Sequence, residues 1–182
     1  MVLSITPQVN KGWKAKDFHL ISVDSNQYNF QNIERTYGLV VVFLCNHCPY
    51  VKSIITKVVR EAEALTKLGI GFVAINSNDG ISYPEDSYEN MKLFATKNNF
   101  QFPYLFDETQ KVAKSYNAVC TPDFFGFNSA LELQYRGRLD PTDKDITANA
   151  KSELYVAMKE ILETSRFEGN AIPSIGCSIK WR

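Results

Sequence analysis

The stretch CNHCPYVK, residues 45–52, holds the residue types best suited to chemistry in this sequence. Cys45 and Cys48 are three residues apart, His47 lies between them, and Pro49 follows directly. A thiolate is a nucleophile and a metal ligand, and an imidazole binds metals or carries a proton. The stretch therefore predicts a redox site or a metal site. The remaining interpretation is two buried thiols that act as small hydrophobic side chains.

The element before this stretch favours Cys48 over Cys45 as the reactive thiol. LVVVFL, residues 39–44, is apolar throughout, as expected of a central strand buried on both faces. Such a strand would run straight into Cys45, whereas CNH supplies a loop before Cys48, and Pro49 suits the first turn of a helix. Unpaired N–H groups and the positive end of the helix dipole would lower the pKa of Cys48 below ~8.5, and a protonated His47 would add positive charge.

Strands and helices alternate along the chain, which predicts an α/β sandwich with a mixed sheet. The predicted strands are 18–23, 28–30, 39–44, 70–76, 104–106, 122–128 and 132–139, and the predicted helices are 31–38, 50–68, 87–99, 108–117 and 148–165. We expect one domain over 1–182, with 166–182 as a tail. SNDGISYPED, residues 77–86, is a predicted surface loop. If strands 39–44 and 70–76 are parallel neighbours, Asn76 and Asn78 reach the rim of the site.

The composition argues against nucleic-acid binding and against a membrane protein. Twenty basic and twenty acidic residues leave no basic excess for nucleic acid. No segment is apolar enough over a sufficient length to span a bilayer, and the first residues lack a leader pattern, so we expect no membrane association and a cytoplasmic location. In a reducing compartment, close cysteine pairs are more often catalytic or metal-binding than structural. Nothing in the composition indicates the oligomeric state.

Several segments resemble known redox proteins. HCPYV resembles the C-P-Y-C of glutaredoxins and the W-C-P-x-C of cytochrome-maturation thioredoxins, with Val51 in place of their second cysteine. AKDFHLISVD and the run from KNNFQFPYLF to PDFFGFN resemble the peroxiredoxin and thiol-reductase branch. The chain is identified as a member of a peroxiredoxin-like (AhpC/TSA, redoxin) group that carries NHCPYVK and a tail like PSIGCSIKW.

This resemblance implies a thioredoxin-like three-layer sandwich with an N-terminal hairpin and a strand–helix insert. It implies a thiol–disulfide oxidoreductase with antioxidant activity, without a cofactor, acting on protein or small-molecule thiols and disulfides. It also implies a cis bond at Thr121–Pro122, in a loop that lies against the reactive sulfur and offers backbone groups to an extended substrate. We expect Asp123, just after it, to be an exposed turn carboxylate, with a proton acceptor near Cys48 as the alternative.

The sequence departs from the peroxiredoxin pattern P-x-x-x-T-x-x-C. Val41 stands at the proline position and Cys45 at the threonine position, which puts peroxidase activity in doubt. Arg136 or Arg138 could supply a thiolate-stabilising arginine, although most arginines simply lie at the surface.

The sequence also leaves open which thiol resolves a mixed disulfide on Cys48, because Val51 cannot. Cys45 is the first expectation, since a tight loop can bring its Cα within disulfide reach. Cys177 is the second, on a tail that could swing across the site. Cys120 is the third, because strand alternation turns its side chain away from that of Thr121, which should face the site. An external thiol is a further possibility.

Two other classes remain open. Cys45, His47 and Cys48 suit copper or zinc, with Cys120 as a fourth zinc ligand. The other histidine, His19, lies in the first predicted strand and is a poor ligand candidate. A non-catalytic adaptor is the second class. Two experiments separate these two classes from a redox protein. Stoichiometric copper or zinc in the purified protein would indicate a metal site. After alkylation of Cys48, an adaptor would keep its binding, whereas a redox protein would lose thiol exchange.

Overall fold

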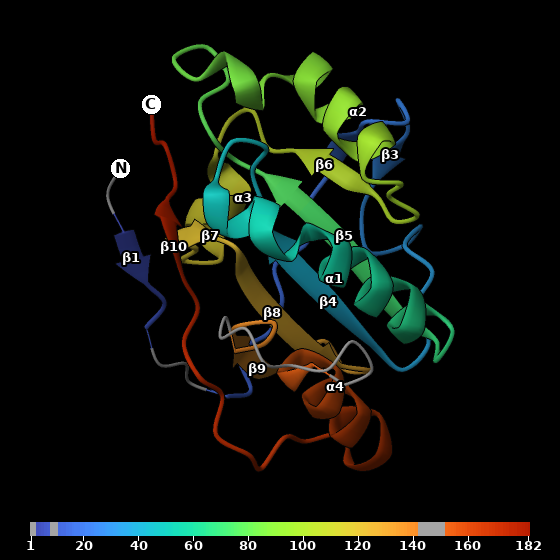
Figure 1. The fold of residues 1–182 in the computed structure, drawn as a ribbon. Helices are drawn as coiled ribbons and strands as arrows, with labels where there is room; N and C mark the ends of the chain where they lie inside the picture. The colour runs from blue at the N-terminus through green and yellow to red at the C-terminus, as the bar shows by residue number, and fades with distance from the viewer. Residues whose placement is uncertain (1–2, 8–10, 142–151) are drawn as a thin grey trace.

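A computed structural model describes residues 3–7, 11–141 and 152–182, which form two sheets flanked by helices (Figure 1). The strands are β1 (Leu3–Ile5), β2 (Leu20–Ser22), β3 (Gln27–Tyr28), β4 (Gly38–Phe43), β5 (Ile70–Asn76), β6 (Tyr104–Phe106), β7 (Cys120–Thr121), β8 (Asp123–Asn128), β9 (Leu133–Gly137) and β10 (Ile175–Ser178). The helices are α1 (Pro49–Thr66), α2 (Tyr88–Lys97), α3 (Lys111–Ser115) and α4 (Glu153–Thr164), with a 3-10 helix at Pro84–Asp86.

The larger sheet is mixed and has the order β3-β2-β6-β5-β4-β8-β9. β4 pairs parallel with β5, and β5 with β6, while β2–β3, β2–β6, β4–β8 and β8–β9 are antiparallel. The predicted mixed sheet, the N-terminal hairpin and the parallel pairing of β4 with β5 are confirmed. Because β4 and β5 run the same way, the loops after both strands leave from one edge of the sheet.

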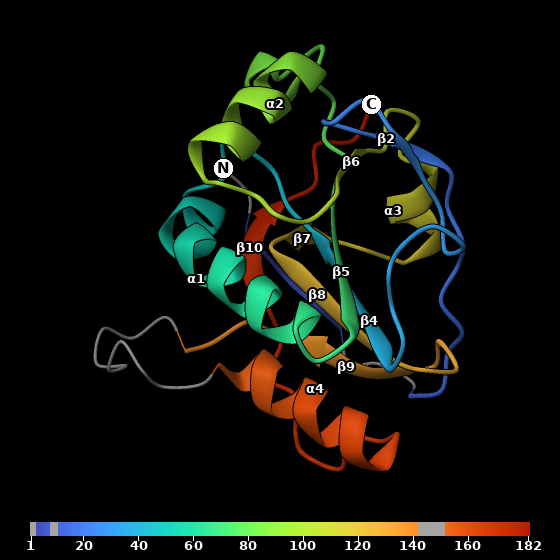
Figure 2. The ribbon, with the colours of Figure 1, turned by 90° about the vertical axis from the view of Figure 1, so that its right-hand side faces the viewer.

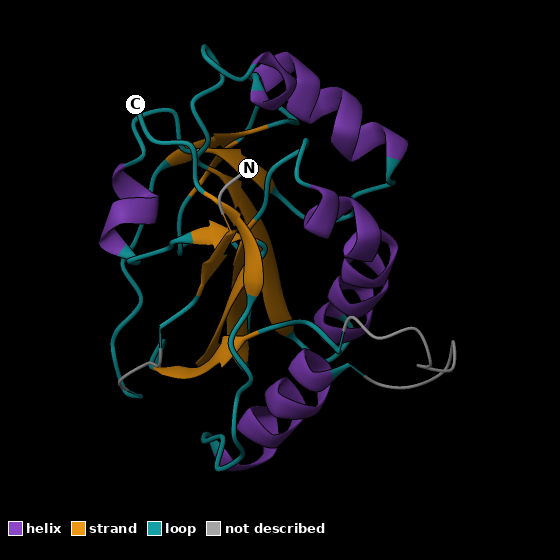
Figure 3. Cartoon of the chain, turned by 60° about the vertical axis from the view of Figure 1, so that its left-hand side comes forward, coloured by secondary structure: helices purple, strands orange, loops and turns teal. Residues whose placement is uncertain are grey.

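Both faces of the larger sheet are covered. In β4, Val40 and Val42 pack in the cluster that includes α1 and α4, whereas Leu39, Val41 and Phe43 pack in the cluster on the α3 side. Figure 3 shows the three longer helices on one side of the strands and the short helix on the other. Burying each such side chain contributes about 1.5–3 kcal/mol to the free energy of unfolding. The apolar sequence of β4 therefore accounts for its central position in the sheet.

The second sheet joins segments from opposite ends of the chain. Its order is β1-β10-β7, with both pairs antiparallel, and Cys177 lies opposite Leu3 on one side and Thr121 on the other. Figures 1 and 2 show β10 beside the N-terminal end of α1. The sequence pattern did not predict β1 or β10 as strands.

The predicted helix at 31–38 is wrong, because residues 31–37 form turns, bends and irregular backbone and Gly38 already begins β4. Asn32 Oδ1 accepts the N–H of Asn29, and Asn29 Oδ1 accepts the N–H of Gln31. Such local side-chain bonds compete with helix formation, and a segment this short cannot offset the cost of nucleation.

Two other predicted helices have different bounds among the described residues. Gln110 has φ 61, so α3 starts only at Lys111. α4 begins at Glu153, because the Ser152 side chain accepts the Tyr155 N–H as its N-cap. Residues 148–151 of that prediction lie outside the described residues.

Candidate active site

Cys48 is the N-cap of α1, which confirms its predicted place at the start of the helix. Its backbone is extended, Pro49 takes the first helical position, and the Cys48 carbonyl accepts the Lys52 N–H at 3.0 Å. The fully described first turn holds no acidic residue. The helix dipole and the unpaired N–H groups therefore favour a negative charge on the Cys48 sulfur.

Three residues besides the helix surround this sulfur. Cys48 Sγ lies 2.8 Å from Cys177 Sγ and 3.2 Å from the Thr121 carbonyl oxygen. A hydrogen bond from the Cys45 thiol has the largest effect on the pKa of Cys48 and lowers it. Burial opposes this, but further bonds from the Cys177 thiol and from the N–H groups of Val51 and Cys177 bring the pKa of Cys48 to about 4. These surroundings favour the thiolate form of Cys48 over the thiol.

The neighbouring sulfurs keep their protons. Burial, followed by the contact with Cys48, raises the pKa of Cys177 to about 12. The hydrogen bond to Cys48, followed by burial, raises the pKa of Cys45 well above its usual value. The surroundings of the cluster thus favour the charged form at Cys48 and the protonated form at Cys45 and Cys177.

Thr121 connects the two cysteines of the CNHC stretch. Its hydroxyl lies 3.1 Å from Cys45 Sγ, and its carbonyl is the one that contacts Cys48. The peptide bond Thr121–Pro122 is cis, as the resemblance implied. The Cys120 sulfur instead contacts the Pro122 carbonyl oxygen at 3.6 Å, and burial raises its pKa.

A buried carboxylate holds the loop before Cys48. Asp86 is fully buried, and it accepts the Asn46 N–H at 2.6 Å and the Asn78 side-chain amide at 2.7 Å. His47 Nδ1 lies 2.5 Å from Asp86 Oδ2, and the Asn76 amide lies 3.5 Å from Oδ1. The Nδ1 atom of His47 is therefore already hydrogen-bonded to Asp86. The predicted approach of Asn76 and Asn78 to this end of the sheet is confirmed.

The predicted surface loop 77–86 is only partly exposed. Ser77, Asn78 and Asp79 are buried at its start and Asp86 at its end, whereas Ile81 is exposed. The buried ends hydrogen-bond into the structure, which satisfies their polar groups. Sequence reasoning missed Asp86 because nothing in the sequence distinguishes it from Glu85, although its loop was expected at this edge.

The possible metal ligands that the structure brings together differ from the predicted set. The possible ligand atoms of Cys45, His47 and Asp86 lie within 4.8 Å of one another, and Cys48 is not part of that group. Both oxygens of Asp86 already accept hydrogen bonds. A metal would have to replace them, so the geometry fits a hydrogen-bond network better than a metal site.

The expectations for Asp123 and Arg136 are wrong. Neither residue is exposed at a turn or on the surface, because they form a buried ion pair with Arg136 Nη2 2.8 Å from Asp123 Oδ2. Arg136 also donates to the Asn117 carbonyl and lies over the Phe125 ring. The guanidinium is thus engaged by these groups. Arg138 pairs with Glu153 at 2.8 Å.

Solved structures share this fold over most or all of the chain. An uncharacterized conserved protein from Geobacillus kaustophilus is 42% identical, with a TM-score of 0.92 over 100% of this chain and 97% of the other. A hypothetical protein from Sinorhizobium meliloti 1021 is 33% identical, with a TM-score of 0.88 over 98% of each chain. The thioredoxin domain of a thiol-disulfide oxidoreductase from Bacteroides vulgatus has a TM-score of 0.64 at 13% identity, over 85% of this chain and 99% of the other.

Fold and site together define a thioredoxin-like protein with a cysteine at the start of a helix and a cis-proline beside it. The AhpC/TSA family matches residues 12–139, and the chain belongs to this family. No curated protein matches the sequence.

Proposed function

We propose that this chain is a thiol–disulfide oxidoreductase in which Cys48 is the nucleophile. One observation carries the proposal: Cys48 is the N-cap of α1, and its sulfur lies 2.8 Å from the Cys177 sulfur, next to the cis-proline loop. Its surroundings also lower its pKa to about 4. Such surroundings stabilise a thiolate, and the thiolate is the form that attacks disulfides. The AhpC/TSA family and the thioredoxin-like fold support the same reaction class.

The reaction begins when the Cys48 thiolate attacks one sulfur of a substrate disulfide RS–SR. The substrate S–S bond breaks, one RS⁻ leaves and takes a proton, and RS– remains bonded to Cys48. A second thiol then loses its proton and attacks the Cys48 sulfur, which releases the other RS⁻. The substrate gains two electrons and two protons, and the protein is left with one disulfide.

We assign the second attack to Cys177, which reverses the order expected from sequence. The two sulfurs lie 2.8 Å apart, and β10 holds Cys177 opposite Thr121. Cys45 contacts Cys48 too, but its sulfur also contacts the Thr121 hydroxyl, so we assign it the role of a hydrogen-bond donor to the thiolate. Cys120 has no part in the proposed exchange.

The proposal favours disulfides over peroxides as oxidants. Cys45 stands where a peroxiredoxin has a threonine, and a buried thiol is a weaker donor than a hydroxyl. We expect peroxide to oxidise Cys48 more slowly than a small disulfide does.

We also propose the partners and the cellular location of the reaction. No helix within the described part of the chain is long and apolar enough to cross a membrane. The balance of twenty basic and twenty acidic residues supports thiol and disulfide partners over nucleic acid. We propose a cytoplasmic location, because the mechanism needs reduced thiols at rest.

The test is single-turnover oxidation of the reduced protein by 2-hydroxyethyl disulfide, followed by mass spectrometry of the products. We expect wild type to form the Cys48–Cys177 disulfide. Cys177→Ser should stop at a mixed disulfide on Cys48, and Cys120→Ser is the matched control that should behave as wild type.

Cys48→Ser should lose the fast reaction altogether. If Cys48 reacts no faster than cysteine in a denatured chain, the redox proposal fails and a non-catalytic adaptor becomes the better interpretation. If Cys177→Ser still closes a disulfide as fast as wild type, Cys45 is the resolving thiol.

A further inference from the structure

Strand β10 occupies the edge of β7, the strand whose Thr121 carbonyl contacts the Cys48 sulfur. Cys177 pairs with Thr121 and Ser178 with Cys120, in antiparallel register. Gly176 makes this close approach possible, because a Cβ at that position would fall on the Thr121 carbonyl. The same carbonyl contacts the Cys48 sulfur, so β10 lies directly against the site.

The position of β10 matters because of how extended polypeptides bind. They commonly add as a strand to a free sheet edge, where main-chain hydrogen bonds supply affinity. The edge of β7 would present such a chain to Cys48. This edge already carries β10, and Cys177 stands where the cysteine of a bound polypeptide would stand.

The segment around β10 is held on both sides. β1 pairs along its outer edge, and the Thr6 N–H donates to the Ser174 carbonyl at 3.0 Å. Further on, the Lys180 N–H donates to Asn78 Oδ1 at 2.9 Å, and the Lys180 carbonyl accepts the Asp79 N–H at 2.9 Å. Displacing this segment would break all of these bonds, and each is worth about 0.5–1.5 kcal/mol.

Both sulfurs of the Cys48–Cys177 contact are buried. Cys48 is 0% exposed and Cys177 is 1% exposed. A cavity of about 240 Å³ lies near this cluster, and its lining includes Pro122 and Tyr50, close in the chain to Thr121 and Cys48, and Ile172 and Ile175, close in the chain to Cys177. This volume is below the usual range for drug-sized ligands and suits a small molecule rather than a polypeptide.

We propose that β10 acts as a built-in substitute for a substrate strand, so that Cys48 reacts with low-molecular-weight disulfides entering beside Pro122 and excludes polypeptide disulfides. This inference rests on the proposed function of Cys48. The exchange is the one written above, with the small disulfide as the oxidant. Local movement around the cavity exposes the sulfur, while β10 stays paired.

The experiment compares two oxidants in single turnover, 2-hydroxyethyl disulfide and the disulfide-linked dimer of an unstructured ten-residue peptide. We expect wild type to react at least 100-fold faster with the small disulfide. Gly176→Ala should lift β10 from Thr121 and reduce this ratio at least tenfold, mainly by a faster reaction with the peptide. Ser178→Ala, in the same strand and without a steric clash, is the control that should keep the wild-type ratio.

A second variant tests the route without disturbing β10. Ile172→Trp should fill the cavity and slow the small disulfide at least fivefold, while the thiolate absorbance at 240 nm stays unchanged. An unchanged rate in this variant overturns the proposed route, even if Gly176→Ala fails to fold. Equal wild-type rates with both oxidants overturn the role of β10 but leave the proposed function standing, whereas reaction with neither overturns the function itself.

Discussion

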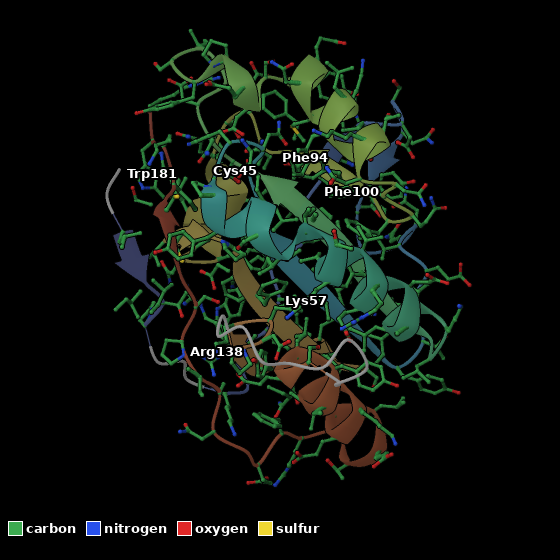
Figure 4. The ribbon with its side chains drawn as sticks, in the orientation of Figure 1. Cys45, Lys57, Phe94, Phe100, Arg138 and Trp181 are labelled. Carbon is green, nitrogen blue, oxygen red and sulfur yellow. The ribbon has the colours of Figure 1, made fainter. Side chains whose placement is uncertain are left out.

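The sulfur of Cys45 lies 3.1 Å from the hydroxyl of Thr121, and this contact ties the loop after β4 to the cis-proline loop. Figure 4 labels Cys45 near the N-terminal end of α1, at about the same height in the view as Trp181 on the C-terminal segment. Thr121 also places its carbonyl against Cys48. Cys45 is thus held where its thiol donates to Cys48, so its effect on the Cys48 thiolate can be measured.

Removing the Cys45 donor should raise the pKa of Cys48. In Cys45→Ala the thiolate loses its strongest hydrogen bond while burial remains, so we expect the pKa to rise by at least one unit. Absorbance at 240 nm against pH measures this change. Cys120→Ala is the control, and an unchanged pKa in Cys45→Ala would contradict the assigned role.

Alkylation of Cys48 should depend little on pH near neutrality. Because the pKa of Cys48 is about 4, the thiolate is already formed at pH 6, and the rate constant with iodoacetamide should stay flat from pH 6 to 9. It should fall as the pH approaches 4. A rate that climbs tenfold per unit between pH 6 and 8 would indicate an ordinary thiol.

The thiol cluster should make stability depend on pH. The pKa of Cys48 falls from an ordinary 9.0 to about 4 on folding, so its stabilising effect is complete above pH 9 and is lost as the pH falls toward 4. The pKa of Cys177 rises to about 12 on folding, so its effect is present below pH 9 and is lost as the pH rises toward 12.

The cluster therefore stabilises the protein most near pH 9. Between pH 6 and 8, Cys48 releases one proton on folding, so the free energy of unfolding should rise by about 1.4 kcal/mol per pH unit. Urea unfolding of the reduced protein at pH 6, 7 and 8 measures this slope. Cys48→Ser should lack that part of the slope, and a slope equal to that of wild type would count against a thiolate in the folded state.

The Asp86 network should be a strong contributor to stability. Asp86→Ala would leave the buried N–H of Asn46 and the amide of Asn78 without their acceptor, at a cost of about 3 kcal/mol or more. Urea unfolding of the variant gives this number. The neighbouring Glu85 is exposed, and Glu85→Ala should cost less than about 0.5 kcal/mol.

The buried pair of Asp123 and Arg136 should behave differently from the surface pair of Arg138 and Glu153. Arg136→Met leaves a buried carboxylate uncompensated and should cost about 3–5 kcal/mol. Arg138→Met breaks a partly exposed pair and should cost under about 1 kcal/mol. Adding Asp123→Asn to Arg136→Met should recover much of the loss, and thermodynamic double-mutant cycles measure this coupling.

Local patterns predicted the central part of this fold well. The apolar runs of β4 and β5 and the helical spacing after Pro49 are strong local signals, and they place Cys48 at the start of α1. The place of Cys48 followed from counting loop residues between two such elements. The turns at 31–38 were misread because side-chain bonds of Asn29 and Asn32 prevail over a weak helical pattern.

Long-range contacts explain what local patterns could not predict. β1 and β10 are short and form only because each pairs with a segment far away in the sequence. Cys177 was therefore expected on a swinging tail rather than in a paired strand. The partnership of Asp123 with Arg136 likewise depends on the pairing of β8 with β9, which brings the two residues into contact across strands.

The pairing of β7 with β10 also sets an order of events during synthesis. Cys48, Thr121 and α1 leave the ribosome well before residues 175–178 are made. Domains begin to fold while synthesis continues, so the larger sheet can form with the edge of β7 still bare. During that interval the Cys48 sulfur lacks the cover of β10. We expect the nascent chain to be more open to oxidation than the finished protein, and thiol-rich surroundings would protect it until β10 is in place.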